Sequence, residues 1–235
     1  MNQTTAPPSI LIVGASRGIG LGLVREYLSR GWRVIATERK PSPDSALGRL
    51  AQASAGALRV EAIDIDRPEQ IAALSERLRG AALDVLLVNA GVIDNAPQLP
   101  IGQIGTEEFT RLMVTNALSP LRVIETLAAQ VKPQGTIAAM SSGLGSIANN
   151  ADGGSELYRA SKAALNMLLR SYAARAGGER TVLALMPGWV RTDMGGPKAP
   201  VTVEQSARGL ADTIARHAGQ RGMAFVDYQN APIAW

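Results

Sequence analysis

Short apolar runs alternate with longer helical patterns along almost the whole of this 235-residue chain. The first run, "SILIVG" at 9–14, is continuously apolar and ends in glycine, as is typical of a parallel strand buried on both faces. Strict alternation of strands and helices predicts a parallel sheet with helices on both faces. We expect strands at 9–14, 33–37, 58–65, 83–91, 135–142, 181–188 and 222–228, and helices at 18–30, 44–54, 68–80, 106–131, 155–176 and 202–219.

The length of the chain fits one well-buried α/β domain and is short for two. We therefore expect a single domain over residues 1–235, built on a doubly wound parallel sheet of about seven strands. Three long irregular stretches, 92–105, 143–155 and 189–201, each follow the C-terminal end of an expected strand. Ligands of open α/β sheets bind at this edge, so these stretches are the expected walls of a site.

The composition argues against several kinds of function. The chain has no cysteine and a single histidine, His217, so we expect no disulfide, no metal site and no Ser-His-Asp triad. The net charge is +4, but the basic residues are scattered and only 4% of the residues are aromatic, which argues against binding of nucleic acid. We find neither a signal peptide nor an apolar run of membrane-spanning length. We therefore expect a soluble, cytoplasmic protein.

A glycine-rich turn, "VGASRGIG" at 13–20, joins the first strand to the first helix. Gly14, Gly18 and Gly20 form the pattern G-x-x-x-G-x-G, which differs from the G-x-G-x-x-G fingerprint. Glycine allows the backbone to approach a pyrophosphate, and the helix N-terminus behind it offers free N–H groups. A tight turn without a ligand is the alternative, but the position after the first strand favours a dinucleotide phosphate site.

The residues after the second strand, in "VIATERK", bear on the choice of coenzyme. Glu38 could accept hydrogen bonds from a ribose 2′-OH and would repel a 2′-phosphate, which favours NAD(H). Arg39, and Arg17 in the glycine turn, could bind that phosphate. Two arginines against one glutamate favour NADP(H), with NAD(H) left open.

The stretch "LYRASKAAL" at 157–165 places Tyr158 and Lys162 four residues apart. Residues at this spacing share one face of a helix. An ammonium beside a phenol favours the phenolate, so Lys162 is expected to lower the pKa of Tyr158 and make it a usable proton donor. Taken alone, the pair would also suit an ordinary half-exposed helix.

Five stretches in order resemble those of the classical short-chain dehydrogenase/reductases. They are "GASRGIG" at 14–20, "VNAG" at 88–91, "MVTNAL" at 113–118, "MSSG" at 140–143 and "YRASK" at 158–162. The similarity covers nearly the whole chain and implies a Rossmann-type fold in which one domain carries the coenzyme and substrate sites. The later "MPGWVRTDMGGP" and the ending "FVDYQNAPIAW" are similar to the C-factor and sniffer-type carbonyl reductase branch.

The resemblance assigns catalytic roles to four residues. Tyr158 would pass a proton to or from the substrate oxygen, and Lys162 would hold the nicotinamide ribose. Ser142 would hydrogen-bond the substrate carbonyl, with Ser141 as the alternative. Asn116 would organise a water that links Lys162 to solvent. Pro120 lies four residues after Asn116 and lacks an N–H, so the Asn116 carbonyl loses its helical partner and could hold such a water.

The resemblance also implies contacts to the coenzyme. Asp64 and Ile65 would contact the adenine, and Asn89 to Gly91 would lie beside its ribose. Each has a structural alternative, because Asn89 could satisfy buried backbone and Asp64 could end a strand. The full expected set is Gly14, Ser16, Arg17, Gly18, Ile19, Gly20, Glu38, Arg39, Asp64, Ile65, Asn89, Ala90, Gly91, Tyr158, Lys162, Pro187, Gly188, Val190 and Thr192. Val13 and Val88 depart from the family's Thr and Asn, which affects the coenzyme site and not the reacting atoms.

The expected function is an NADP(H)-dependent oxidoreductase that transfers a hydride between the nicotinamide and a carbonyl or alcohol substrate, with Tyr158 as the acid/base. Alternatives are an NAD(H)-preferring enzyme of the same class and a dinucleotide-binding signalling protein with little turnover. The stretch 92–99 shows no obvious charged anchor, so we expect a small or medium, fairly apolar aldehyde or ketone. The resemblance implies a homodimer or homotetramer formed through helices 106–131 and 155–176.

Overall fold

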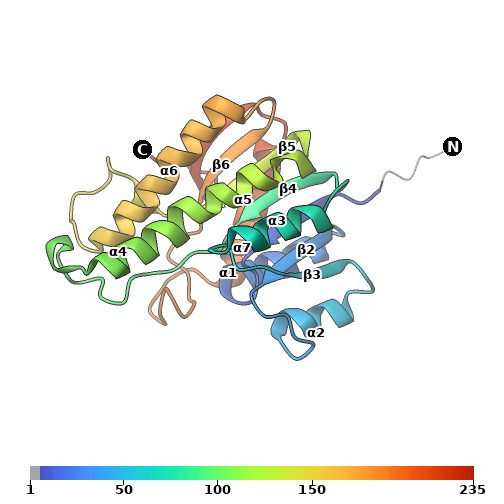
Figure 1. Ribbon diagram of the computed structural model, residues 1–235, viewed down its shortest axis with the longest axis horizontal. Helices are drawn as coiled ribbons and strands as arrows, with labels where there is room; N and C mark the ends of the chain where they lie inside the picture. Colours follow the sequence, from blue (N-terminus) through green and yellow to red (C-terminus); the bar gives the residue numbers. More distant parts are fainter. Residues whose placement is uncertain (1–5) are drawn as a thin grey trace.

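The computed structural model describes residues 6–235 and contains one sheet of seven parallel strands, which confirms the predicted fold class (Figure 1). The strand order is β3-β2-β1-β4-β5-β6-β7. The chain reverses its direction of winding between β1 and β4, which makes their carboxyl ends the switch point where ligands of such sheets bind. The strands are β1 (Ser9–Val13), β2 (Arg33–Glu38), β3 (Leu58–Ala62), β4 (Leu83–Val88), β5 (Val131–Met140), β6 (Thr181–Met186) and β7 (Gly222–Asp227).

Helices cover both faces of the sheet because alternate side chains of the strands point to opposite faces. In β1, Leu11 and Val13 pack with α3, α5 and α6, whereas Ile10 and Ile12 pack with α1, α2 and α7. In register, Ile10 lies between Val34 of β2 and Val85 of β4. The helices are α1 (Gly18–Ser29), α2 (Ala46–Ala53), α3 (Pro68–Arg77), α4 (Thr106–Met113), α5 (Ser119–Leu127), α6 (Glu156–Ala176) and α7 (Val203–His217).

The prediction of one uninterrupted helix at 106–131 is wrong. The chain forms α4, a π-helical turn at Val114–Leu118, α5, and a 3₁₀ turn at Ala128–Gln130. In the π turn, the N–H of Ser119 bonds to the carbonyl of Val114. Pro120 cannot donate to the Asn116 carbonyl and its ring crowds that group, so the wider turn accommodates the interruption. Figure 1 shows α4 and α5 running end to end beside α6.

Several expected boundaries shift. Strand β4 ends at Val88 because the N–H groups of Asn89 and Ala90 both bond to the carbonyl of Val13, which turns the chain out of the strand. Strand β3 likewise ends at Ala62 and not at 65. Strand β5 begins at the buried Val131, before the expected start at 135, and the three residues after Val131 are exposed, so no apolar pattern announces this part of the strand.

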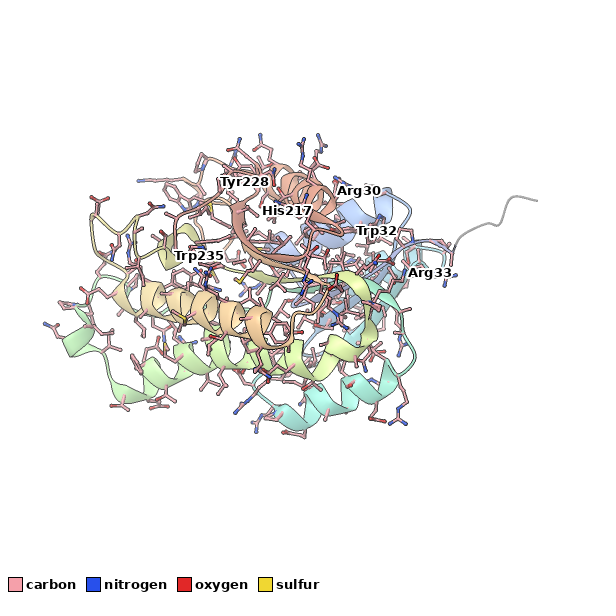
Figure 2. All side chains as sticks on the ribbon, turned by 90° about the horizontal axis from the view of Figure 1, so that it is seen from above. Arg30, Trp32, Arg33, His217, Tyr228 and Trp235 are labelled. Carbon is pink, nitrogen blue, oxygen red and sulfur yellow. The ribbon has the colours of Figure 1, made fainter. Side chains whose placement is uncertain are left out.

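His217 lies at the end of α7, partly buried, with its Nε2 atom 2.9 Å from Oδ1 of Asn230 (Figure 2). Among residues 6–235 no cluster of three or more His, Cys, Asp or Glu side chains could hold a metal ion. Within the same residues, no helix combines the length and apolar character that crossing a membrane requires.

Candidate active site

The glycine turn lies between β1 and α1, at the switch point of the sheet. Gly14 has a φ of +89°, and a Cβ atom there would lie 2.7 Å from Cα of Ala90. A Cβ on Gly20 would lie 2.2 Å from the Gly14 carbonyl oxygen, and one on Gly18 would lie 3.3 Å from Cγ2 of Thr192. The turn therefore packs against the end of β4 and against the loop after β6. These contacts bring together three groups of the residues predicted to bind the coenzyme.

The N-terminus of α1 is open to an anion. Its N-cap residue Arg17 makes no side-chain capping bond, and the first turn contains no acidic residue. Ser16 and Arg17 are exposed, and Ile19 is partly buried. Free N–H groups and the positive end of the helix dipole at a glycine turn fit the pyrophosphate of a dinucleotide.

Asn89 connects this turn to the end of β4. Its Nδ2 atom donates a hydrogen bond to the Gly14 carbonyl at 2.6 Å, so the structural role considered for Asn89 is real. Two residues later, a Cβ on Gly91 would lie 3.2 Å from Oδ1 of Asn116 and 3.4 Å from Nζ of Lys162. The stretch 89–91 thus joins the glycine turn to the predicted catalytic residues.

The residues at the end of β2 differ in their surroundings. Glu38 is buried, and its Oε1 atom accepts a hydrogen bond from the hydroxyl of Ser45 at 2.8 Å. Ser45 also caps α2 by accepting the N–H of Gly48. Arg39 is exposed and forms no ion pair with the described residues, whereas Arg17 pairs with Asp193. Glu38 is thus tied to the start of α2, and Arg39 is free to bind a ligand.

The two candidate serines take different places. The buried Ser141 hydroxyl donates to Oδ1 of Asn166 at 2.6 Å, inside the protein. Ser142 is partly exposed, and its hydroxyl lowers the pKa of the Tyr158 phenol. The geometry therefore favours Ser142 over Ser141 as the partner of Tyr158.

Lys162 lies one helical turn after Tyr158 on α6 and is 4% exposed. Its ammonium donates to the carbonyl of Met140, the last residue of β5, at 2.9 Å and lies 5.8 Å from the centre of the Tyr158 ring. Burial lowers the pKa of Lys162 to about 8. The predicted sharing of one helix face by Tyr158 and Lys162 is confirmed.

The predicted direction of the tyrosine pKa is wrong for the protein's own groups. The pKa of Tyr158 is raised to about 12, because burial disfavours the phenolate more than the Ser142 hydroxyl favours it. The nearby carboxylate of Asp94 raises the pKa further. Lys162 is not among the groups that lower the pKa of Tyr158, and its own pKa is lowered by burial.

Asn116 holds the loop that follows β4. Its side chain donates to the Val92 carbonyl and accepts the Val92 N–H, both at 2.8 Å, and it also donates to the hydroxyl of Ser161 at 3.0 Å. It is fully buried in the π turn. The structure thus brings Asn116 close to Lys162 through Gly91, and the water beside its backbone carbonyl stays a prediction.

The two residues predicted to contact the adenine, Asp64 and Ile65, differ in burial. Asp64 is partly exposed and its carboxylate accepts the N–H of Asp66, whereas Ile65 is buried in the apolar core. Sequence reasoning missed Asp66, which accepts hydrogen bonds from the hydroxyls of Thr115 and Ser119 at 2.6 and 2.7 Å. Asp66 thereby ties the loop after β3 to the π turn, a long-range pairing that no local pattern signals.

The loop that follows β6 also packs against the glycine turn. Gly188 has a φ of +87° and packs against the ring of Tyr228, and the Pro187 carbonyl accepts the hydroxyl of Ser206. Val190 is buried and bridges to residue 201. Thr192 lies against Gly18, as described above.

One acidic residue of the stretch without an obvious charged anchor, Asp94, is buried. This residue, in the stretch 92–99, is 4% exposed. Its carboxylate raises the pKa of Tyr158. The sequence showed an acid in a loop, which is usually a solvated position, and gave no signal of its burial.

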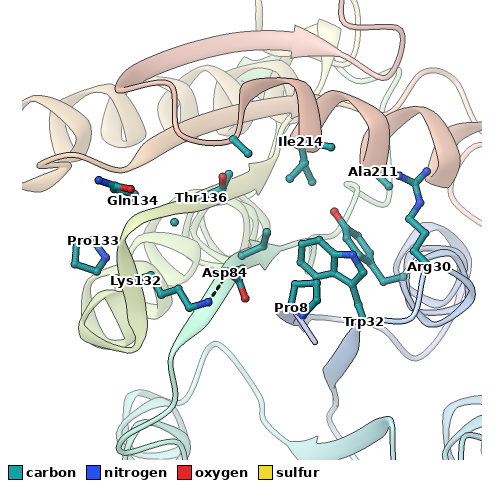
Figure 3. Close-up of a pocket in the computed structure, with 15 residues that line it drawn as sticks. Pro8, Arg30, Trp32, Asp84, Lys132, Pro133, Gln134, Thr136, Ala211 and Ile214 are labelled. Carbon is teal, nitrogen blue, oxygen red and sulfur yellow. Dashed lines mark hydrogen bonds and ion pairs between the residues drawn. The ribbon is translucent and has the colours of Figure 1, made fainter. Parts of the chain in front are cut away.

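A cavity of about 760 Å³ lies elsewhere, at the amino ends of β1, β4 and β5 (Figure 3). Figure 3 shows Trp32 and Arg30 on one side and the ion pair of Lys132 with Asp84, with a 2.6 Å distance between Nζ and Oδ1, on the other. None of the predicted site residues lines this cavity. It is therefore separate from the candidate active site, which lies at the carboxyl ends of the strands.

Comparisons with known proteins agree with this arrangement. A family model described as "short chain dehydrogenase" matches residues 8–201. The chain is 40% identical over 158 residues to C-signal of Myxococcus xanthus, covering 65% of this chain and 93% of that protein. A solved structure of a Burkholderia multivorans protein, described as a short-chain dehydrogenase/reductase with bound NADP, is 47% identical with a TM-score of 0.95, over 98% of this chain and all of that one.

Carbonyl reductase Sniffer of D. melanogaster is 30% identical, with a TM-score of 0.87, over 98% of this chain and all of that one. The similarity to this protein and to C-signal confirms the branch expected from the sequence. The family model covers far more than half of the chain and includes the glycine turn, Asn116, Ser142, Tyr158 and Lys162. The chain belongs to the short-chain dehydrogenase family, whose members are oxidoreductases.

Proposed function

We propose that this protein is an NADP(H)-dependent oxidoreductase that interconverts a carbonyl compound and its alcohol, with Tyr158 as the acid/base. The observation that carries the proposal is the placement of Tyr158, which shares a face of α6 with the buried Lys162 and whose pKa is lowered by the hydroxyl of Ser142. These groups are joined to the glycine turn through the stretch 89–91. One domain, residues 1–235, carries the coenzyme and substrate sites.

In the direction of reduction, Tyr158 is the proton donor. Its pKa of about 12 keeps it protonated at neutral pH. When bound, NADPH supplies the hydride that forms the new C–H bond at the carbonyl carbon. As negative charge develops on the substrate oxygen, Ser142 donates a hydrogen bond to it and Tyr158 transfers its phenolic proton. In the reverse direction the phenolate takes that proton from the alcohol.

Lys162 and Asn116 support this transfer. The Lys162 ammonium, 5.8 Å from the Tyr158 ring, stabilises the phenolate that remains after the proton has left. It would also hold the ribose hydroxyls of the coenzyme. Asn116 fixes the start of the loop 92–105 and so keeps one wall of the substrate site in place.

The preference for NADP(H) is supported by the surroundings of Arg39 and Glu38. Arg39 is exposed, and no described residue neutralises it, so its guanidinium can bind a 2′-phosphate. Glu38 is bound by Ser45 and is thereby less available to a ribose hydroxyl. The NADP bound to the similar Burkholderia multivorans protein agrees with this preference.

Assembly into a homodimer or homotetramer and a cytoplasmic location remain predictions. The helices expected to form the interface expose large apolar side chains, which supports the first of these. They are Phe109 and Leu118 in the α4–α5 segment and Met167 and Leu168 on α6.

The decisive test is Tyr158→Phe, with Tyr172→Phe as a matched control on the same helix. Tyr172 is buried, and its hydroxyl has no hydrogen-bond partner among the described residues. Tyr158→Phe should lower carbonyl reduction by about 10²- to 10⁴-fold, with an unchanged circular dichroism spectrum. Tyr172→Phe should reduce the same aldehydes and ketones as the wild type. Turnover by Tyr158→Phe at the wild-type rate would overturn the role of Tyr158.

The similarity to C-signal favours one alternative, a dinucleotide-binding signalling protein with little turnover. Fluorescence titration with NADPH and NADH, followed by a panel of carbonyl compounds, separates the two functions. Tight binding of a coenzyme without turnover of any carbonyl would favour the signalling protein. Turnover in that panel favours the oxidoreductase.

A further inference from the structure

The segment that carries Ser142 is tied to one face of α6 at successive points. Tyr158, Lys162 and Asn166 are spaced four residues apart, so they follow one another along that face. The Lys162 ammonium bonds to the Met140 carbonyl at the end of β5. Asn166, one turn further along α6, binds the residues that come next in the chain.

Asn166 uses both ends of its side-chain amide and is 4% exposed. Its Oδ1 atom accepts the hydroxyl of Ser141 at 2.6 Å, and its Nδ2 atom donates to the Gly145 carbonyl at 3.2 Å. These two partners lie one residue before Ser142 and three residues after it. A single amide on α6 therefore holds the chain on both sides of Ser142.

Ser142 is itself part of the short turn that Asn166 holds. It precedes the 3₁₀ turn Gly143–Gly145, and its hydroxyl oxygen accepts the N–H of Leu144 at 3.1 Å. Its backbone carbonyl accepts the N–H of Gly145 at 2.9 Å. A hydroxyl that accepts one hydrogen bond in this way still has its own O–H to donate. The turn thus leaves Ser142 as a donor, and its place relative to α6 depends on how the turn is anchored.

The turn packs closely against α6. A Cβ atom on Gly145 would lie 2.9 Å from Cβ of Lys162 and 3.1 Å from Nδ2 of Asn166. The turn therefore lies directly against the helix face that carries the proposed catalytic lysine. Loss of the two Asn166 bonds would allow the turn, and the Ser142 hydroxyl with it, to move away from that face.

Asn166 could instead serve only the stability of the fold, because buried polar groups are usually hydrogen-bonded. Asparagine is a poor residue for a helix interior, however, and replacing both members of a buried polar pair by apolar groups is often nearly neutral for stability. What the bonds of Asn166 fix is the position of residues 141–145 on α6. The experiment below separates positioning from a purely structural role.

We propose that Asn166 is a positioning residue for the reduction, and that it holds the Ser142 hydroxyl at the substrate oxygen through its bonds to Ser141 and Gly145. This inference rests on the proposed function, since it concerns the group that donates to the substrate oxygen there. In this role Asn166 need touch neither the substrate nor the coenzyme. Its replacement should therefore act on turnover only through Ser142.

The test is a double-mutant cycle of Asn166→Leu and Ser142→Ala. Leucine keeps the branched shape of asparagine and makes neither hydrogen bond. The value of kcat is measured for the wild type, both single variants and the double variant, with NADPH and the carbonyl compound that the wild type reduces fastest. Such a cycle isolates the interaction between two residues, because effects that do not pass from one to the other are additive.

The two backgrounds should give different results. In the wild type, Asn166→Leu should lower kcat by about tenfold, because a small displacement of a group at the reacting atoms is costly to the rate. In Ser142→Ala the same substitution should change kcat by less than about twofold, since the hydroxyl that it displaces is already gone. Equal losses in both backgrounds, or an unchanged kcat in Asn166→Leu, would overturn the proposal.

Thr181→Val is the matched control for the loss of buried hydrogen bonds. Thr181 is 2% exposed at the start of β6, and its hydroxyl donates to the carbonyls of His217 and Gln220 at 3.0 and 2.8 Å. Both Thr181→Val and Asn166→Leu should lower the melting temperature, because each leaves buried groups unpaired. Only Asn166→Leu should lower kcat, and an equal loss of kcat in Thr181→Val would overturn the proposal.

Binding of the coenzyme gives a second readout. The dissociation constant of NADPH, measured by fluorescence titration, should stay close to the wild-type value in Asn166→Leu, because Lys162 keeps its own bond to Met140. A large rise would show that α6 itself has shifted and would overturn the specific action on Ser142. If Asn166→Leu does not fold, Asn166→Ala enters the same cycle, since it leaves space for a water between the two partners.

Failure of this proposal is distinct from failure of the proposed function. Additive losses of kcat in an active enzyme would overturn the role of Asn166 and leave the proposed function intact. Absence of turnover by the wild type on every carbonyl compound would overturn the proposed function, and the role of Asn166 with it.

Discussion

The ammonium of Lys162 donates a hydrogen bond of 2.9 Å to the backbone carbonyl of Met140, which joins α6 to the last residue of β5. This bond holds a positive charge at the carboxyl edge of the sheet, one helical turn from Tyr158. Burial alone lowers the pKa of Lys162, and no acidic side chain contributes to it. Among the described residues, the Lys162 ammonium thus donates to a backbone carbonyl, and no carboxylate neutralises its charge.

Replacing this lysine should stabilise the protein while it removes activity. Burial lowers the pKa of Lys162 from its ordinary value of 10.5 to about 8, which corresponds to a folding cost of at most about 3 kcal/mol at neutral pH. Lys162→Met should therefore raise the free energy of unfolding at pH 7, measured with urea, and lower carbonyl turnover. A less stable variant would show that the lysine is structural.

The pH dependence of this effect has a definite sign. The folded-state pKa lies below the unfolded value, so the unfolded chain binds more protons between about pH 8 and 10.5. The free energy of unfolding of the wild type, relative to Lys162→Met, should rise across this window and stay constant below it. A difference that does not vary with pH would contradict the assignment.

The two serines should respond in opposite ways. Ser142→Ala should lower kcat by about ten- to a hundredfold, because it removes a hydrogen bond to the reacting groups, with little change in melting temperature. Ser141→Ala leaves the buried Oδ1 of Asn166 without its donor and should cost about 1–3 kcal/mol of stability. Steady-state kinetics and thermal unfolding of both variants check the pair, and an exchange of the two outcomes would refute the choice of Ser142.

Arg39→Ala should weaken the binding of NADPH more than the binding of NADH. Loss of a charge-assisted bond to a 2′-phosphate should raise the dissociation constant of NADPH by about ten- to a hundredfold, while NADH binds as before. Lys40→Ala removes the same charge from the neighbouring exposed position and is the matched control. Fluorescence titration measures the dissociation constants of NADPH and NADH for each of the two variants. Equal effects of both substitutions on NADPH binding would indicate a general charge effect instead of phosphate binding.

Met167→Glu should break the expected assembly. Met167 is 63% exposed on α6, and a carboxylate there cannot be buried between two copies of the chain without a large cost. Ile147→Glu places the same charge at a 75% exposed residue outside α4, α5 and α6. Light scattering should show a smaller particle for Met167→Glu alone, and an unchanged mass would place the interface elsewhere.

The spacing of residues predicted the local parts of the site well. Tyr158 and Lys162 share a face because the helical period puts residues four apart together. Gly14 sits where β1 ends and α1 begins, and its φ of +89° explains why the pattern needs glycine. The alternation of apolar runs likewise predicted the seven strands, since a doubly covered strand must be apolar on both sides.

The sequence did not predict contacts between distant segments. Nothing local indicates that Ser45 binds Glu38 or that Asn116 bonds to the backbone of Val92. The division of 106–131 was also missed. Pro120 signalled an interruption, but a kink and a π turn are both ways to relieve it, and packing decides between them.

The sequence by itself determined the order of strands and helices, the glycine turn and the pairing of Tyr158 with Lys162, because these depend on periodicity and on the backbone freedom of single residues. Only the tertiary structure decided the burial of Asp94 and Lys162, the separate surroundings of Ser141 and Ser142, and the rise in the pKa of Tyr158. The physical reason is that hydration and charge depend on everything packed around a group, and those neighbours come from parts of the chain far apart in sequence.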